Sequence, residues 1–428
     1  ESGAIFTFGK SKFADNVPSK FWLKNDKAVY ISCGDEHTAL ITNGKLYVFG
    51  SNNWGQLGLG TKDTVYKPTC VKELKSERVK LVACGRNHTI VCTEQCKMYA
   101  CGGNNEGQLG LDDAQERDTF HQIKFFTGKF KIKQLAAGSN ISAALTADGK
   151  LYTFGESDNG KLGLLPEQLN NTRVPQVVNG VSDRVKQVAC GGGHTVALSD
   201  DDVYTFGFGQ YGQLGHGTFT FESSLPKTVS HFQKKKVKRV ACGENHTAVI
   251  TDDDVYTFGF GQYGQLGHGT FTFESSLPKT VSHFQKKKVK RVACGENHTA
   301  VITENGLLYT FGDGRHGKLG LGDENFTNQF KPTLCSRFMK YSVLLVACGG
   351  CHMLVHVVPR PKDAEPVIIQ QDEINDNYLE KSYIEFKGDT ASPGTLRRTL
   401  SARDRRRERV CICNFKKKKI NNIYIKRK

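Results

Sequence analysis

Two patterns in this chain have the residue types and spacing for chemistry, and one of them is the spacing of a dinucleotide-binding turn. Gly207-Phe-Gly209-Gln-Tyr-Gly212 reads G-x-G-x-x-G, and the same turn returns within residues 255–267. In a dinucleotide site this turn follows a strand and opens a helix whose N-terminus holds the pyrophosphate. Here the chain continues as Gln213-Leu-Gly-His-Gly-Thr-Phe-Thr-Phe221, which has no helical pattern. We therefore interpret the glycines as turn residues with positive φ, and we expect no bound cofactor.

The second pattern is a cysteine followed four residues later by a histidine. Each pair offers two metal ligands, whereas structural zinc usually takes four. Cys348-Gly-Gly-Cys351 and Cys411-Ile-Cys413 also lack a second pair at zinc spacing. We expect no metal, and interpret the cysteines as small buried residues between repeated units and the histidines as bonded to the backbone of their own turns. The pairs are Cys33/His37, Cys84/His88, Cys190/His194, Cys242/His246, Cys294/His298 and Cys348/His352.

The same positions mark an internal repeat that must position these side chains. Its members are Cys33, Cys84, Ala137, Cys190, Cys242, Cys294 and Cys348, spaced 51 to 54 residues apart. Each unit holds short runs rich in Val, Tyr, Phe and Thr, bounded by Gly, Asn and Asp, which predict strands. About four short strands in a unit of this length are typical of a propeller blade.

The two ends of the repeat complement each other. Ile5-Phe-Thr-Phe-Gly9 is a second-half strand without a first half, and the run from Val346 to Val355 is a first half without a second. We predict an all-β, seven-bladed propeller over residues 1–358, closed by N-terminal strands that complete the last blade. A linker over 359–396 and a basic tail over 397–428, which we expect to be disordered, follow.

Charge separates the tail from the body. Residues 397–428 hold 14 Lys/Arg and two acids, a net charge of 14 − 2 = +12 out of +16. The body has 45 basic and 41 acidic groups, a net charge of only +4, which argues against a nucleic-acid partner. Without a long apolar run or a signal peptide, we expect a cytoplasmic chain with no transmembrane segment. We also expect a monomeric propeller.

One repeated segment is unusual because it does not vary. Residues 200–251 and 252–303 are identical at all 52 positions. Such identity indicates either a very recent exon duplication or an error in the assembly of the sequence. If one blade was gained, another was lost, because the count is still seven.

Ala-Cys-Gly-x-x-His-Thr followed by Leu-Tyr-x-Phe-Gly-x-x-x-x-Gly-Gln-Leu-Gly resembles the repeat of the regulator-of-chromosome-condensation family, over Ile5 to Val358. Gly50-Ser-Asn-Asn-Trp-Gly-Gln-Leu-Gly and Thr310-Phe-Gly-Asp-Gly-Arg-His-Gly-Lys-Leu-Gly are similar to a ciliary branch. That resemblance implies a trafficking scaffold at the cilium, its transition zone and the basal body. Its partners would be small GTPases, a ciliary interacting protein and a prenyl-binding delta subunit.

The resemblance also leaves the activity open between two exchange factors. One acts on a Rab- or Arf-like GTPase at the cilium, and the other is a chromatin-associated factor for a Ran-like GTPase. Nucleotide exchange needs a binding surface rather than bond-making residues, so the absence of a nucleophile elbow or P-loop motif excludes neither. An ultraviolet sensor is disfavoured, because Trp22 and Trp54 are too few for a coupled aromatic cluster.

Partner binding should use loop positions at which the units differ. Exposed aromatics flanked by charges are plausible anchors. The basic connection Gln233-Lys-Lys-Lys-Val-Lys-Arg, repeated from Gln285, fits either a solvated edge or a contact with an acidic partner or headgroup. The candidate loop residues are Trp54, Glu106, Glu116, Phe120, His121, Asn140, Tyr211, Tyr263, Arg315 and His316.

Overall fold

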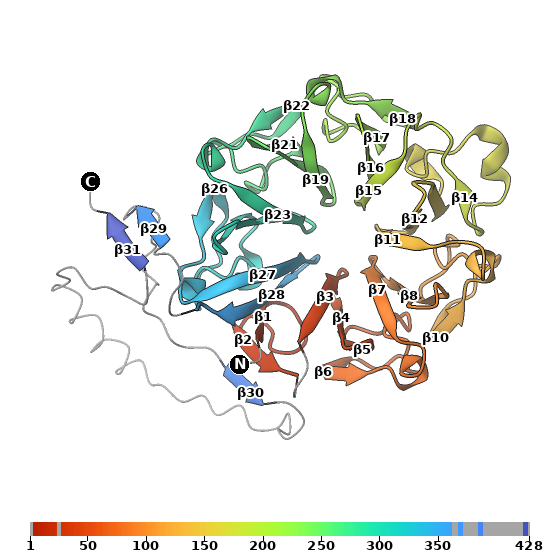
Figure 1. Cartoon of the computed structure of the whole chain (residues 1–428), viewed down its shortest axis with the longest axis horizontal. Helices are drawn as coiled ribbons and strands as arrows, with labels where there is room; N and C mark the ends of the chain where they lie inside the picture. Colours follow the sequence, from red (N-terminus) through yellow and green to blue (C-terminus); the bar gives the residue numbers. More distant parts are fainter. Residues whose placement is uncertain (1–2, 24–26, 362–366, 371–383, 388–422, 427–428) are drawn as a thin grey trace.

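Seven β-sheets stand around a central channel in the computed structural model of the chain (Figure 1). The structure describes residues 3–23, 27–361, 367–370, 384–387 and 423–426. Each sheet is an antiparallel blade whose first strand lies at the channel and whose fourth lies at the rim. The prediction of an all-β, seven-bladed propeller is confirmed.

The strands are numbered along the chain, and the blades are counted from β3. Blades one and two are β3 (Ala28–Cys33), β4 (His37–Thr42), β5 (Lys45–Gly50), β6 (Val65–Cys70), and β7 (Val79–Cys84), β8 (His88–Thr93), β9 (Met98–Gly102), β10 (Arg117–Gln122). Blades three and four are β11 (Ile132–Ala137), β12 (Ile141–Thr146), β13 (Leu151–Gly155), β14 (Gln176–Val177), and β15 (Val185–Cys190), β16 (His194–Ser199), β17 (Val203–Phe208), β18 (Glu222–Thr228). Blades five and six are β19 (Val237–Cys242), β20 (His246–Thr251), β21 (Val255–Phe260), β22 (Glu274–Thr280), and β23 (Val289–Cys294), β24 (His298–Thr303), β25 (Leu308–Gly312), β26 (Gln329–Leu334).

The seventh blade combines both ends of the propeller sequence. Its strands are β27 (Tyr341–Cys348), β28 (His352–Pro359), β1 (Ala4–Gly9) and β2 (Ser19–Trp22). Strand β1 pairs with β28 from Ala4 opposite Val357 to Gly9 opposite His352. The ring therefore closes through N-terminal strands, as the sequence predicts, and no blade is left as an open half.

Residues that follow the seventh blade form three further short strands, of which one joins the ring and two form a separate sheet. β30 (Ile384–Lys387) pairs in parallel with β2, and β29 (Val367–Gln370) pairs in parallel with β31 (Ile423–Lys426). Most of the predicted linker and tail lies outside the described residues, so these two boundaries remain predictions.

Eight 3-10 helices, η1 to η8, are the helices of the described chain. They are η1 (Lys72–Leu74), η2 (Lys124–Phe126), η3 (Asp158–Gly160), η4 (Pro166–Asn170), η5 (Ser230–Phe232), η6 (Ser282–Phe284), η7 (Arg315–Gly317) and η8 (Ser336–Phe338).

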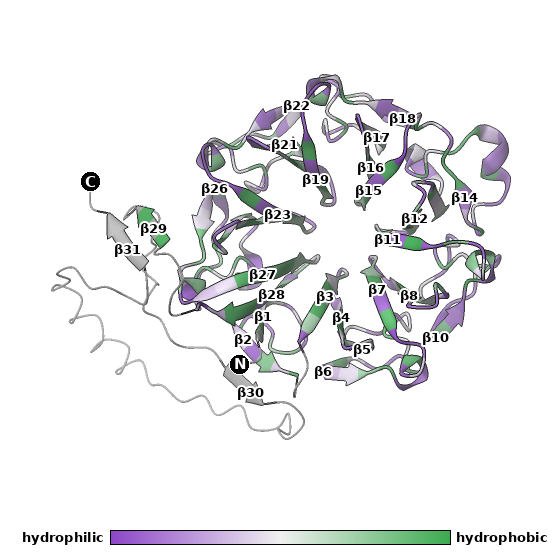
Figure 2. Ribbon diagram, viewed as in Figure 1, coloured by the Kyte–Doolittle hydropathy of each residue, from purple (hydrophilic) through white to green (hydrophobic). Residues whose placement is uncertain are grey.

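The core lies between neighbouring blades, and this explains the apolar second strands. All six residues of β4, β8, β12, β16, β20 and β24 are buried, because adjacent sheets cover both faces of each strand. Glycines permit this close packing: a Cβ on Gly215 would lie 2.8 Å from the ring of Phe258 in the next blade. Hydrophilic residues are prominent on outer strands such as β10, β18 and β22 (Figure 2).

A belt of hydrogen bonds links the repeated histidines from blade to blade. His37 Nε2 lies 2.9 Å from Thr89 Oγ1 of the next blade, and four other histidines make the same contact. The Thr89 hydroxyl donates its own hydrogen to the Gln56 carbonyl at 2.7 Å. It must therefore accept from a protonated Nε2, which fixes the imidazole tautomer. The other contacts, at 2.8 to 2.9 Å, are His88–Ser142, His194–Thr247, His246–Thr299 and His352–Thr38.

The belt corrects the expectation that each histidine bonds to the backbone of its own turn. The imidazole instead reaches a hydroxyl of the neighbouring blade, since the ring lies flat against the glycine that follows the cysteine. A Cβ on Gly34 would lie 2.4 Å from His37 Nδ1. This contact explains why Cys-Gly-x-x-His recurs as a unit.

Two positions interrupt the belt. Ile141 replaces the histidine of blade three, and Met353 replaces the hydroxyl residue of blade seven. Because Met353 offers no hydroxyl, neither ring nitrogen of His298 is hydrogen-bonded, although the side chain is fully buried. The repeated cysteines lie between blades as predicted: Cys84 Sγ faces the Ser32 carbonyl at 3.7 Å, and Cys242 Sγ faces that of Ala189 at 3.6 Å. Of the six only Cys84 is buried, and the other five are half-buried because they line the channel. All described cysteines are free.

Replacing one belt hydroxyl isolates the contribution of its imidazole bond. We expect Thr89→Val to lower the free energy of unfolding by about 2–4 kcal/mol, because it leaves His37 Nε2 without a partner and the Gln56 carbonyl with only the weak Cys101 thiol donor. Thr195→Val is the matched control, since Thr195 donates to the Lys161 carbonyl and blade three has Ile141 in place of the histidine. We expect it to cost about 1–2 kcal/mol. Equal losses in urea unfolding would show that the imidazole bond adds nothing.

The belt also predicts acid sensitivity. Burial lowers the pKa of His88, His194 and His352 to about 4 and of His37 and His246 to about 3. The unfolded chain therefore binds protons below pH 6.5 that the folded chain rejects, so stability falls as pH decreases from about 6.5 toward 4. At pH 5.5 the loss is about 1.4 kcal/mol per histidine relative to pH 7.5.

Urea unfolding at pH 7.5 and 5.5 measures this loss. His88→Leu should reduce it by one histidine, while His121→Gln, which replaces an exposed imidazole, should leave it unchanged. A stability that does not change between the two pH values would contradict the neutral belt.

Candidate interaction face and channel mouth

The Cys-Gly turns and the glycine-rich turns lie at the same end of the propeller. A first strand ends where the second begins, and the third strand returns to the same level: His194 lies opposite Gly207. The Cys-Gly turns around the channel and the glycine-rich turns outside them therefore share one face, which we call the turn face. The 3-10 connections that contain η1, η2, η5 and η6 lie at the opposite face.

The glycine-rich turn has a structural explanation. Gly207 and Gly212 have φ of +109° and +82°. A Cβ on Gly207 would lie 2.8 Å from His194 Cα, and one on Gly209 would lie 2.7 Å from the Thr220 carbonyl. After this turn the chain enters the outer strand β18, not a helix. The interpretation of these glycines as turn residues is confirmed, and Gly209 serves close approach instead of positive φ.

The channel mouth on the turn face gathers charged side chains from different blades. The Cys-Gly turns of six blades and the equivalent Ala137-Gly138 turn of blade three line a cavity of about 310 Å³. The residue after this dipeptide varies around the ring and is charged or polar in five blades, as Asp35, Arg86, Ser139, Glu244 and Glu296. Arg86 and Glu244 form an ion pair of 2.7 Å across the channel, and Ser139 donates to Glu244 at 3.3 Å.

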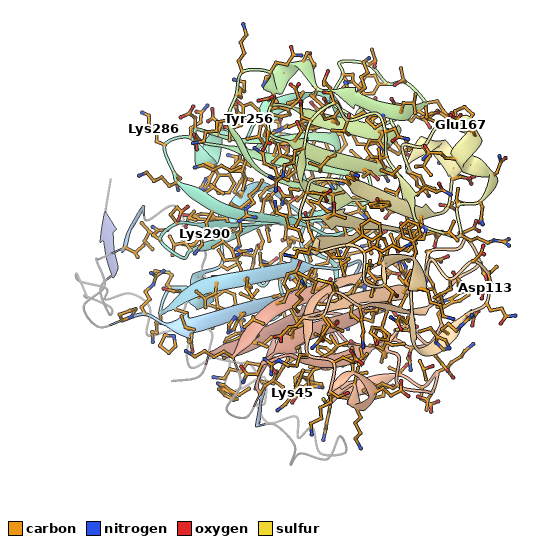
Figure 3. All side chains as sticks on the ribbon, turned by 45° about the vertical axis from the view of Figure 1, so that its right-hand side comes forward. Lys45, Asp113, Glu167, Tyr256, Lys286 and Lys290 are labelled. Atoms are coloured by element: carbon orange, nitrogen blue, oxygen red, sulfur yellow. The ribbon has the colours of Figure 1, made fainter. Side chains whose placement is uncertain are left out.

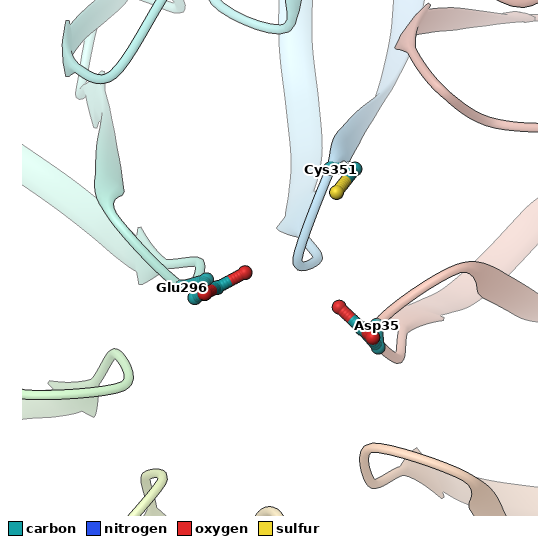
Figure 4. Close-up of side chains that lie close together, drawn as sticks. All are labelled: Asp35, Glu296 and Cys351. Carbon is teal, nitrogen blue, oxygen red and sulfur yellow. The ribbon is translucent and has the colours of Figure 1, made fainter. Parts of the chain in front are cut away.

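Asp35, Glu296 and Cys351 approach one another beside this ion pair (Figure 4). Their oxygen and sulfur atoms lie within 4.8 Å of one another. Among the residues that the structure describes, this is the one group of three possible metal ligands at such short distances. Burial raises the pKa of all three, and repulsion between Asp35 and Glu296 adds to the rise at Glu296. The trio offers fewer ligands than structural zinc usually takes, and Lys318 opposes it with a positive charge, so we assign it no metal.

Trp54, Glu106, Tyr211 and Tyr263 occupy equivalent positions in the glycine-rich turns. The backbone N–H of each donates to the side-chain oxygen of the glutamine two residues later, at 2.9 to 3.0 Å. The glutamine of Gly-Gln-Leu-Gly is thus architectural, and the residue two positions before the glutamine, which contributes only its backbone N–H, is free to vary. Glu106 is exposed, whereas Trp54, Tyr211 and Tyr263 are half-buried.

In blades three and six, lysines replace this glutamine. Lys161 pairs with Glu156, and burial lowers its pKa to about 8. Lys318 pairs with Asp313 at 2.5 Å, and both side chains are 1% exposed. Arg315 also donates to Asp313, at 2.8 Å, and stays exposed. His316 follows with a φ of +63° and contacts Asn16 Oδ1 of the seventh blade at 2.8 Å.

The remaining sequence candidates do not form one site. Phe120 is wrong as an exposed anchor: it is 8% exposed, because β10 turns its ring inward against Gly58. Glu116 pairs with Lys62 at 2.5 Å on the outer part of blades one and two, and His121 is exposed on β10. Asn140 lies in a Cys-Gly-type turn of blade three. The charged channel residues were not among the predicted sites, although the sequence marks them: Asp35, Arg86, Glu244 and Glu296 each follow a Cys-Gly pair directly.

Comparison with known proteins now adds to this geometry. Residues 1–197 and 122–355 match the family described as RCC1-like domain. The chain belongs to the RCC1-like domain family. Its seven blades and repeated turns are the fold on which the sequence resemblance depended, and that resemblance is confirmed.

Curated relatives match over most of this chain but not over most of their own length. Human X-linked retinitis pigmentosa GTPase regulator is 55% identical over 418 residues, 96% of this chain and 40% of that protein. The mouse regulator is 53% identical over 413 residues, with similar coverage. The ultraviolet-B receptor UVR8 of Arabidopsis thaliana is 33% identical over 312 residues, 71% of this chain and 70% of the receptor. This chain therefore spans about 40% of the length of the regulators that it resembles.

Solved structures agree on the fold. Human WBSCR16 has a TM-score of 0.74 and 25% identity, covering 84% of this chain and all of that chain. Prp20p of Saccharomyces cerevisiae has a TM-score of 0.72 and 22% identity, covering 84% of this chain and 92% of that chain. No helix among the described residues is long and apolar enough to cross a membrane.

Removing Arg86 should change the ionisation of the channel mouth. Arg86 lowers the pKa of Asp35 and Glu296 in opposition to their burial. We expect Arg86→Ala to raise both pKa values, measured by NMR titration of ¹³C-labelled carboxyl groups. Arg78→Ala, which breaks the exposed pair with Glu94 near the opposite face, is the control. Unchanged titration of both acids in Arg86→Ala would show that the ion pair is not coupled to them.

Proposed function

We propose that this propeller is a protein-interaction scaffold that regulates protein trafficking and assembly at the cilium. We further propose that its turn face binds a Rab- or Arf-like small GTPase and accelerates release of its nucleotide. The observation that carries the proposal is the 55% identity to human X-linked retinitis pigmentosa GTPase regulator over 96% of this chain. The ciliary location, with a ciliary interacting protein and a prenyl-binding delta subunit as partners, rests on this similarity.

The geometry of the turn face is suited to such a role. A rigid ring holds the turns of every blade, and the residue two positions before the architectural glutamine or lysine differs between most blades, as Trp54, Glu106 and Tyr211 illustrate. Nucleotide release requires only that this surface bind the nucleotide-free GTPase more tightly than the loaded form. The bound partner then shifts the equilibrium without any bond-making residue.

A chromatin-associated exchange factor for a Ran-like GTPase is the alternative. The structure of Prp20p was described together with binding to Gsp1p and histones, but its 22% identity shows a shared fold alone. Residues 1–396 of the present chain carry a net charge of only 45 − 41 = +4, whereas binding to DNA depends on neutralising phosphates with Lys and Arg. The charge distribution therefore favours the ciliary proposal.

Nucleotide release tests the choice directly. The full chain is mixed with Ran-, Rab- and Arf-like GTPases loaded with fluorescent GDP, and bound partners are recovered in parallel. We expect faster release from a Rab- or Arf-like protein and none from Ran. Glu106→Lys, on the turn face, should weaken GTPase binding, while Glu73→Lys, on the opposite face, should not.

Three outcomes are informative. Release from Ran alone would overturn the proposal in favour of the alternative. Stable capture of a prenyl-binding protein without release from any GTPase would support the scaffold and overturn the exchange activity. Absence of a tagged chain from the transition zone of ciliated cells would overturn the ciliary role.

A further inference from the structure

The exposed apolar side chains of this propeller are concentrated in one sector. Twelve large hydrophobic residues are exposed in the described chain, and the five outside blades four to six are scattered over other blades. Seven lie in the loops before the outer strands of blades four to six, or on those strands. A contiguous exposed apolar patch marks an interaction surface more often than chance. The seven are Phe219, Phe221, Leu225, Phe271, Phe273, Leu277 and Phe326.

The duplicated sequence builds two copies of one aromatic cradle. In the first cradle the loop returns so that Phe221 packs edge-on against Phe208 at 5.6 Å, with Tyr211 at 5.8 Å from Phe208. The second cradle repeats this arrangement in blade five. Its distances, 5.5 Å for Phe260–Phe273 and 6.0 Å for Phe260–Tyr263, are nearly the same.

The two cradles join into a row of aromatic rings on the turn face, which we call the aromatic stripe; it consists of Phe208, Tyr211, Phe221, Phe260, Tyr263 and Phe273. Tyr211 of the first cradle packs against Phe260 of the second, with the ring centroids 4.9 Å apart and the ring planes tilted by 57°. On the far side, the Arg315 guanidinium lies 5.9 Å from the centre of the Tyr263 ring, a cation–π contact with blade six. The stripe therefore begins with apolar side chains in blade four and ends at a cation.

The junctions between neighbouring blades also change from apolar to cationic along the stripe. At the junction of blades four and five, Leu277 packs on Gly217: a Cβ placed on Gly217 would lie 3.2 Å from Leu277 Cδ2. At the junction of blades five and six the equivalent residue is Lys331, whose Cε would lie 3.2 Å from a Cβ on Gly269. Identical loops thus face an apolar neighbour at one junction and a cationic neighbour at the other.

The outer strands bordering the stripe are poorly suited to extend by strand pairing. Pro226 and Pro278 interrupt β18 and β22 and lack the N–H that a paired edge needs. A ligand would therefore be held by its side chains. Rows of aromatic rings are the means by which grooves bind extended segments.

We propose that the aromatic stripe is a docking site for an extended segment of a partner protein that carries two apolar anchor residues followed by an acidic residue. The two cradles hold the apolar anchors. Arg315 and Lys331 hold the acid, which fixes the direction of the segment from blade four toward blade six. The proposal deepens the scaffold function and rests on it only in taking the occupant to be a protein.

A random peptide library tests the proposal without knowledge of the natural partner. Twelve-residue peptides displayed on phage are selected on the immobilised full chain, and the enriched peptides are measured by fluorescence anisotropy. We expect peptides with two apolar residues followed by Asp or Glu. Tyr263→Ser and Phe273→Ser should each weaken binding about tenfold or more, as expected for aromatic hot spots.

Controls separate the stripe from general hydrophobicity. Tyr66→Ser replaces a tyrosine that is 55% exposed on blade one, and it should leave the affinity unchanged. Arg315→Glu should weaken peptides that end in an acid and strengthen the same peptides when that acid is replaced by Lys. Lys331→Glu gives a second reading of this charge exchange, and unchanged melting temperatures show that the variants fold.

Other occupants are distinguishable outcomes. Enriched peptides without apolar anchors, or affinities that stripe variants do not change, would overturn the proposal. Self-association in sedimentation, or binding to phosphatidylcholine vesicles, that Phe273→Ser abolishes would replace the partner with a second copy or a lipid. Failure to release nucleotide from any GTPase would not affect peptide binding, so this inference and the exchange activity fail separately.

Discussion

The contact between an imidazole of one blade and a hydroxyl of the next is the interaction on which the rest of the propeller depends. His37 Nε2 donates to Thr89, and Thr89 in turn donates to the Gln56 carbonyl in the turn of the preceding blade. One buried hydroxyl therefore ties together a second strand, its neighbour and a glycine-rich turn. Because His352 makes the same contact with Thr38, the belt also joins the blade assembled from both ends to blade one.

This shared frame separates what must stay constant from what can differ. Glycines are required where the imidazole packs against the backbone and where the third strand returns. The residue after Cys-Gly and the residue two positions before the architectural glutamine are not part of this frame. The first set of variable residues charges the channel mouth, through Arg86 and Glu244. The second set shapes the turn face, where Glu106 and Tyr211 occupy equivalent places. The duplicated sequence shows how surroundings decide the result, since Tyr211 meets Phe260 while its copy, Tyr263, meets Arg315.

The extent to which sequence predicted the structure follows the range of the interactions. Strands, turns and the closure of the ring could be predicted because their signals are local and recur with a fixed period. The prediction of Phe120 as an exposed anchor was wrong because a strand alternates its side chains between two faces. Only the pairing with β9 and the packing on Gly58 decide that the Phe120 ring points inward. The prediction of the histidine partners was wrong because the bonded hydroxyl is about one repeat away in the chain, where no local pattern connects the two residues.

The sequence by itself determined the number of blades, their strand order and the turn role of the glycine-rich motif, since period and glycine chemistry are sufficient for each. Only the tertiary structure decided which side chains meet. Arg86 and Glu244 are 158 residues apart and pair because ring closure brings their turns to one channel. The aromatic stripe likewise exists because adjacent blades place two identical loops side by side, and its cationic end because blade six supplies Arg315 and Lys331 as the next neighbour. Identical sequence segments acquire different chemistry once the fold gives them different neighbours.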